Sequence, residues 1–160
     1  MFKYVLQIIV GFFILALSTF VTLYEGSAIT DIPWEWRYST PFSNLFNIEI
    51  MNGHDISQLD YFVYAAKYQP LFPVIMLISI FYILNVFGYY LIKHQPKWRL
   101  IYWGGISCII LLFNRSIFNS PTVGGRTFFW ITLIIGFLSI AITVFVYLKK
   151  TKIMKPVDVN

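Results

Sequence analysis

Four long stretches without a charged side chain constrain this chain of 160 residues more than any other feature of its sequence. They cover residues 4–24, 68–92, 100–114 and 127–148. A helix that crosses a bilayer needs about 20 consecutive apolar residues, and three of the stretches are this long. The remaining stretch, 100–114, reaches the length only when residues 98–118 are counted. Arg99 and Arg115 then lie near the two membrane surfaces, toward which long cationic side chains can extend.

The composition agrees with these spans. Hydrophobic residues make up 58% of the chain and charged residues only 12%, whereas a soluble domain of this size needs more polar surface. We therefore predict an all-α membrane protein, an antiparallel bundle of four transmembrane helices in a single integral membrane domain, residues 1–160. The predicted spans are residues 4–24, 70–92, 98–118 and 127–148, and residues 25–69 form an outer cap.

The first span is open to a second interpretation. Residues 16–18, Ala-Leu-Ser, are typical of the site at which a signal peptide is cleaved. The apolar run continues beyond them through Phe20, Val21 and Leu23. We therefore expect this helix to be retained.

Basic residues gather on one predicted side of the bundle, which carries eight of the 12 lysines and arginines. They are Lys3, Lys93, Lys97, Arg99, Lys149, Lys150, Lys152 and Lys155. Six of the seven acidic residues lie in the first loop of the opposite side. Because lysine and arginine favour cytoplasmic loops, we predict a multi-pass plasma-membrane protein with both termini cytoplasmic and residues 25–69 extracellular.

This distribution also bears on partners. The net charge of +5 comes from the basic residues that set the orientation in the membrane. It therefore does not indicate nucleic-acid binding, and we expect no nucleic-acid partner. The lipid bilayer is the expected partner, and the basic tail is suited to contact anionic lipid. Another membrane or envelope protein and a homo-oligomer stay open as further partners.

An aromatic segment of the cap alternates large and charged side chains. Its candidate outer-surface binding residues are Trp34, Glu35, Trp36, Arg37 and Tyr38. Alternation with a period of two predicts a short extended segment with the aromatic rings on one side. These rings either form an interfacial belt packed on the helix ends or present a binding surface, for instance for a cationic group. We favour packing.

The second half of the cap predicts a short amphipathic helix over residues 55–68. Asp55 is the expected N-cap, and Gln58 stands three residues on, as in a capping box. Apolar residues repeat at helical spacing through the segment. Pro70 ends this helix, and Pro73 suits the first turn of the next span.

Two arginines of the second outer loop, Arg115 and Arg126, face the acidic first loop in this topology. An unpaired cation that is partly buried is costly. We therefore expect Arg115 and Arg126 to pair with acidic residues of the first loop.

The predicted membrane interior contains no Asp, Glu, Lys or His, although proton-coupled transporters usually need ionisable residues at depth. The candidate intramembrane polar residues are Asn85 and Ser107, which either join helices by hydrogen bonds or line a polar cavity. No catalytic, metal-binding or phosphate-binding motif occurs in the sequence. We therefore expect no catalytic residues, no cofactor, no metal and no enzymatic activity.

Three segments carry a resemblance to a known family. They are YEGS at residues 24–27, PWEWRYSTPF at 33–42 and DYFVYAAKYQP at 60–70. With them the chain resembles small membrane proteins of bacilli, the YjdJ-like group, over roughly residues 1–93. The resemblance implies the plasma membrane of a Gram-positive cell, with the outer loop facing the wall, and it carries no activity.

The function predicted from these features is non-enzymatic binding of a partner or ligand through the outer loop. The alternative is a small oligomeric protein that acts in transport or as a channel. A continuous polar cavity through Asn85 and Ser107 favours transport, and a dry interior favours binding.

Overall fold

The computed structural model describes residues 2–92 and 95–154. Within these ranges the chain forms α-helices and short 3-10 helices and contains no strand. In chain order they are α1 (Phe2–Gly26), η1 (Ser27–Asp31), α2 (Pro33–Ser39), α3 (Pro41–Leu45), η2 (Gly53–Asp55), α4 (Gln58–Tyr68), α5 (Leu71–Ile92), α6 (Pro96–Ile117) and α7 (Val123–Met154). Lys93 and Lys155, two of the residues behind the predicted orientation, lie outside the described residues.

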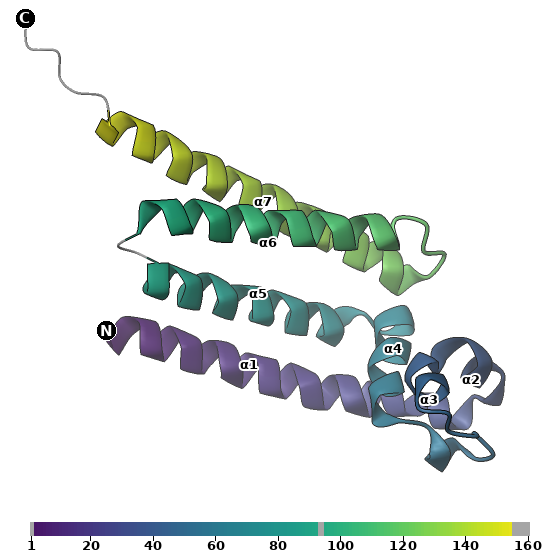
Figure 1. The fold of residues 1–160 in the computed structure, drawn as a ribbon. Helices are drawn as coiled ribbons and strands as arrows, with labels where there is room; N and C mark the ends of the chain where they lie inside the picture. Colours follow the sequence, from purple (N-terminus) through teal and green to yellow (C-terminus); the bar gives the residue numbers. More distant parts are fainter. Residues whose placement is uncertain (1, 93–94, 155–160) are drawn as a thin grey trace, which may run out of the picture.

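Four helices are long and apolar enough to cross a membrane. These candidate spans are Phe2–Asp31, Leu71–Ile92, Lys97–Ile117 and Val123–Leu148. Neighbouring spans run in opposite directions, and the short helices α2, α3 and α4 gather at one end of the bundle (Figure 1). The predicted antiparallel fold with four helices long enough to span a membrane is confirmed, although the first candidate span continues to Asp31, beyond the predicted end at residue 24.

The four spans pack as two pairs, α1 with α5 and α6 with α7, and the α5–α6 interface between the pairs is much sparser. Tyr102 of α6 bridges this interface at one end of the bundle, since its hydroxyl donates a 2.7 Å hydrogen bond to the carbonyl oxygen of Leu84 in α5. Gly88 makes room for the ring, because a Cβ atom there would overlap Tyr102.

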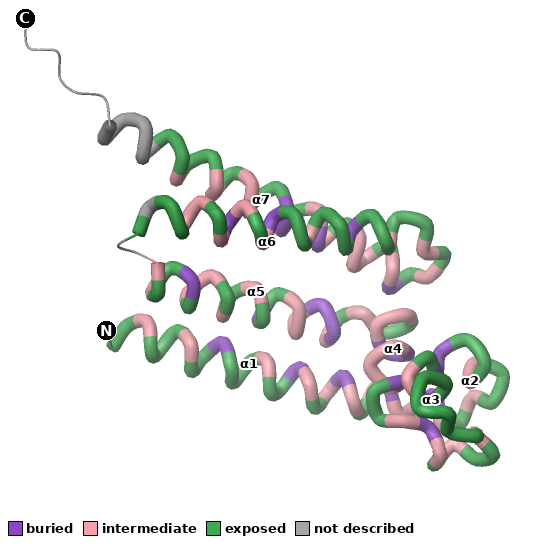
Figure 2. Tube along the Cα trace, viewed as in Figure 1, coloured by how far each residue is buried: buried purple, intermediate pink, exposed green. Residues whose placement is uncertain are grey.

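Small residues form the contact faces inside the pairs, while large apolar side chains point outward. In α1 the buried residues are Gly11, Ser18, Thr22 and Gly26, and the exposed ones lie on the opposite side of the helix (Figure 2). Small residues let backbones approach closely in a medium where apolar side chains gain little from leaving lipid. The hydroxyls of Ser18 and Thr22 are satisfied by carbonyl oxygens of their own helix.

The short helix α4 joins the two pairs at the other end. A Cβ atom at Gly26 of α1 would overlap the carbonyl oxygen of Tyr61, and one at Gly124 of α7 would overlap that of Ala66. Both carbonyls belong to α4, so backbone from each pair lies directly against the same short helix. Glycine is required at both positions because any side chain would push the elements apart.

Two predicted details of the cap are wrong. The segment predicted to be extended is the helix α2, which begins with Pro33 in its first turn, where the fixed φ of proline suits a helix. The amphipathic helix exists, but it begins at Gln58 with Ser57 as its N-cap. The Asp55 carboxylate instead accepts hydrogen bonds from the backbone N–H groups of Met51 and Asn52, because the chain turns there in η2.

The contact of Gly124 with α4 gives a testable prediction. Gly124→Ala should lower the free energy of unfolding by about 1–3 kcal/mol or more, because overpacking forces the backbone to shift. Gly104→Ala is the matched control, since a Cβ atom at Gly104 meets nothing within 4 Å. Thermal unfolding in detergent measures both. Equal melting temperatures for the two variants would contradict the close contact.

Candidate functional site

One exposed face of α2 collects three of the predicted outer-surface residues. Trp34, Arg37 and Tyr38 stand at positions i, i+3 and i+4, which share one side of a helix. Trp34 is 73% exposed and Tyr38 is 68% exposed, and Arg37 is exposed as well. The helical period therefore separates these residues from Trp36, which the predicted alternation had placed beside them.

Trp36 faces the interior of the cap. It packs against a core formed by Ile29, Ile56 and Tyr64, and its Nε1 donates a 2.8 Å hydrogen bond to the carbonyl oxygen of Ile29. An indole N–H that is turned into a core needs such an acceptor. Trp36 thus fixes the inner side of α2, and the prediction that the aromatic residues pack inward holds for this residue alone of the three.

A polar network fastens α2 to the end of α4. Glu35 accepts hydrogen bonds from the Tyr68 hydroxyl at 2.6 Å and from the Ser39 hydroxyl at 2.7 Å. Lys67 donates from Nζ to the carbonyl oxygen of Tyr38 at 2.7 Å and to Ser39 Oγ at 2.9 Å. Four side chains from two helices therefore hold α2 in one orientation.

Three pKa values are shifted in and beside this network, all outside the candidate membrane spans. The hydrogen bond from Tyr68 lowers the pKa of Glu35, because it stabilises the carboxylate. The same bond raises the pKa of Tyr68 to about 12, because the phenolate cannot donate it. Burial in the cap core raises the pKa of Tyr64, and the charge of Glu35 adds to this effect.

Asp60 organises the rest of the cap, and sequence analysis missed it. Its carboxylate is fully buried and accepts hydrogen bonds from the backbone N–H groups of Phe42 and Ser43 and from Ser43 Oγ, at 2.6–2.9 Å. These N–H groups open α3, where a helix has no internal acceptors. Pro41 marks the start of a helix, whose first N–H groups need an acceptor. Nothing in the sequence identifies Asp60, 18 positions after Phe42, as that acceptor.

The two predicted loop-pairing residues, Arg115 and Arg126, are both exposed and lie on either side of the α6–α7 turn. Their pairing with acids of the first loop stays a prediction. The cap and the α6–α7 turn do meet, and the contact runs through backbone, from Gly124 to the carbonyl of Ala66.

The predicted intramembrane polar residues bond to their own helices. Asn85 Nδ2 donates to the carbonyl oxygen of Phe81 at 2.6 Å, and Ser107 Oγ donates to that of Trp103 at 2.8 Å. Asn114 joins α6 to α7, because its Nδ2 donates to both Phe129 O and Thr132 Oγ1 at 2.8 Å. Sequence analysis did not single it out for this role.

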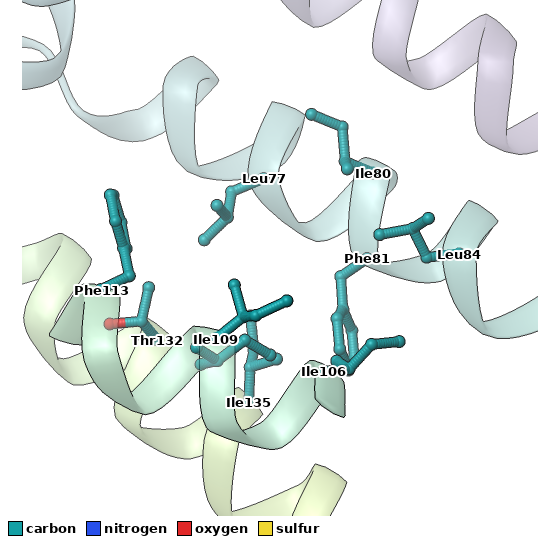
Figure 3. Close-up of a pocket in the computed structure, with 10 residues that line it drawn as sticks. Leu77, Ile80, Phe81, Leu84, Ile106, Ile109, Phe113, Thr132 and Ile135 are labelled. Atoms are coloured by element: carbon teal, nitrogen blue, oxygen red, sulfur yellow. The ribbon is translucent and has the colours of Figure 1, made fainter. Parts of the chain in front are cut away.

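A cavity of about 310 Å³ lies where the two helix pairs meet. Its walls come from α5, α6 and α7, and the side chains that point into it are apolar apart from Thr132 (Figure 3). The Thr132 hydroxyl is already bonded to the carbonyl oxygen of Phe128. The lining presents no charged group and suits hydrocarbon. In the described parts of the chain, no three His, Cys, Asp or Glu side chains come together as metal ligands would.

Comparisons with known proteins agree with the resemblance seen in the sequence. A family model described as a domain of unknown function, DUF4306, matches residues 5–92. The chain is 36% identical over 66 residues to a protein of Bacillus subtilis (strain 168) named "Uncharacterized protein YjdJ". The match covers 40% of this chain and 61% of that relative's length. No solved structure matches the chain significantly.

The two tryptophans of α2 give a matched pair of variants. Trp36→Ala should lower the free energy of unfolding by about 3 kcal/mol, the lower end of the usual cost for a large aromatic, because Trp36 is only partly buried. Trp34→Ala should change it by about 0.5 kcal/mol at most, as an exposed substitution does. Detergent melting measures both. A cost for Trp34→Ala as large as that for Trp36→Ala would refute the assignment of the two faces.

The bond between Glu35 and Tyr68 predicts a pH dependence. Because the pKa of Tyr68 is raised, its hydrogen bond stabilises the fold fully below pH 10, the ordinary pKa of tyrosine. This stabilisation is lost as the pH rises toward about 12, the pKa of Tyr68 in the folded protein. Glu35→Gln should return the pKa of Tyr68 toward 10. Tyrosinate absorbance is measured against pH for the wild type and for Glu35→Gln, each with and without Tyr68→Phe. In each background the difference that Tyr68→Phe makes is the titration of Tyr68 alone. An unchanged pKa in Glu35→Gln would show that the hydrogen bond is not its cause.

Proposed function

Because the chain belongs to the DUF4306 family of domains of unknown function, we propose its role from its own surface: a multi-pass plasma-membrane protein whose cap binds another membrane or envelope protein, without catalysis. The observation that carries this proposal is the exposed face of α2 with Trp34, Arg37 and Tyr38. Tryptophan, tyrosine and arginine are the residue types that dominate binding energy at protein interfaces.

The way α2 is held supports binding. Trp36 anchors the helix from below, and Glu35 and Ser39 fasten it to α4. A face that is already ordered loses little conformational freedom when a partner binds, so more of the contact energy appears as affinity. The bonds beneath α2 are therefore those expected of a surface that is presented to a partner.

The competing role for the same face is an anchor at the lipid headgroups, where tryptophan, tyrosine and arginine also gather. A crosslinking experiment separates the two roles. A photo-reactive residue at Tyr38 of the full chain, in native membranes, should yield one discrete protein adduct. Trp34→Ala and Arg37→Ala should each reduce its yield severalfold, because both remove interface contacts.

Leu45→Ala serves as the matched control, since Leu45 is an apolar residue of the cap that is 70% exposed and lies outside α2. It should leave the adduct unchanged. Adducts with lipid alone, or a protein adduct that all three variants affect equally, would refute the proposed interface.

The proposed orientation places the termini in the cytoplasm and the cap outside, as the distribution of basic residues along the sequence favours. Cysteine labelling tests it on a Cys108→Ser background with an impermeant reagent. Met51→Cys, in the cap and 76% exposed, should react in intact cells. Lys97→Cys, exposed at the other end, should react only after lysis. The opposite pattern would reverse the topology.

The apolar lining of the cavity between the helix pairs favours binding over transport. The cavity between the helix pairs is lined by apolar side chains, and Asn85 and Ser107 give their hydrogen bonds to their own helices. A water path needs polar groups that replace the hydration of what passes.

A further inference from the structure

A second pocket, of about 480 Å³, opens in the half of the bundle opposite the cap. All four spans contribute to its walls. Five aromatic side chains line it: Tyr4, Phe81, Tyr82, Tyr89 and Trp103. The pocket has the size of a small-molecule site, and its aromatic walls offer faces on which a flat ring can stack.

Two amides from facing spans line the same pocket and have hydrogen-bonding groups without a partner. Gln7 of α1 makes no side-chain hydrogen bond within the described residues. Asn85 of α5 gives one N–H of Nδ2 to the carbonyl oxygen of Phe81, and its second N–H has no acceptor in the described part of the chain. An amide left unpaired at membrane depth costs free energy. A ligand with carbonyl oxygens would satisfy both amides.

The lining also limits the charge of such a ligand. Among the described residues no charged side chain lines the pocket. A charged group held at membrane depth without a counter-charge is costly. The pocket therefore favours a neutral polar group over an anion or a cation.

The pocket adjoins the apolar cavity of about 310 Å³ that lies between the helix pairs. Phe81 lines both spaces, and its side chain is seen from the cavity side in Figure 3. From α6 the pocket takes Trp103, and the cavity takes residues that follow it toward the cap, such as Ile109 and Phe113. The polar space and the hydrocarbon space therefore succeed each other along the bundle.

We propose that the pocket and the cavity together bind one quinone that carries a hydrocarbon tail. The ring lies among the aromatic side chains of the pocket, and its carbonyl oxygens accept hydrogen bonds from the amides of Gln7 and Asn85. The tail passes Phe81 into the apolar cavity. A neutral flat head with two acceptors and an apolar tail matches the order of chemistry along the two spaces.

A quinone is favoured over a neutral glycerolipid because a glycerol head has no flat face to stack on the five aromatic side chains. The site is formed by the spans in the half of the bundle opposite the cap, whereas the proposed interface lies on α2 (Figure 1). Neither proposal therefore depends on the other.

The test uses the emission of Trp103, which lines the pocket and is only 5% exposed. A quinone quenches the fluorescence of a tryptophan that it contacts. The full chain in phosphatidylcholine vesicles is titrated with a naphthoquinone that carries a geranyl tail, and the quenching seen in Trp103→Phe is subtracted. The remaining quenching should saturate. A linear rise without saturation would show collisions in the bilayer and would overturn the proposal.

Three variants test the placement of head and tail. Gln7→Leu and Asn85→Leu should each raise the half-saturating mole fraction about fivefold, the effect of one lost hydrogen bond. Leu77→Phe puts a larger side chain into the cavity, so it should weaken binding of the geranyl probe severalfold and leave binding of tailless naphthoquinone unchanged. Equal weakening of both probes by Leu77→Phe would contradict the placement of the tail.

Ser107→Ala is the matched control, since Ser107 is a buried polar residue of a span that lines neither space. It should leave the titration unchanged, and a loss equal to that in the amide variants would overturn the proposal. Helical signal and melting temperature show that each variant is folded. Competition on the wild type decides independently of any variant: displacement of the probe by dioleoylglycerol as effective as that by unlabelled long-tailed quinone would assign the site to a glycerolipid instead.

Discussion

The rest of the structure depends on the direct backbone contact of α4 with two spans. Gly26 of α1 and Gly124 of α7 lie against carbonyl oxygens of the same eleven-residue helix. Since the two helix pairs share a sparse interface elsewhere, α4 fixes their spacing at the cap end. The side chains of α4 then build the cap: Asp60 opens α3, and Tyr68 holds α2 through Glu35.

This arrangement explains why the membrane interior is sparsely packed while the cap has a conventional core. In the cap, Ile29 and Ile56 are buried because water surrounds that end and rewards burial of apolar surface. In the spans the surrounding lipid is as apolar as the side chains, so close approach depends on small residues and on a few hydrogen bonds such as that of Asn114. An apolar cavity between the pairs is tolerated because hydrocarbon can fill it.

The sequence was sufficient for those features that depend on local composition. Uncharged length located the four spans, and Pro70 and Pro73 marked the passage from α4 to α5. The alternation of side chains gave the wrong structure for α2, because five residues are too few to separate a period of two from one of 3.6. The hydrogen bond from Ser39 to Glu35, four residues apart, is one that a helix allows. Asp60, Gly26 and Gly124 escaped prediction because their roles exist only once distant segments meet.

The division into two pairs has a consequence for how such a chain can change over generations. The α6–α7 hairpin contacts the remainder mainly where Gly124 meets Ala66 and where Tyr102 enters the notch at Gly88. Selection for fit therefore acts on a handful of positions in the hairpin, and the other lipid-facing positions are free to drift. The α1–α5 pair carries the cap between its two spans, so more of its positions are constrained and its sequence should diverge more slowly than that of the hairpin.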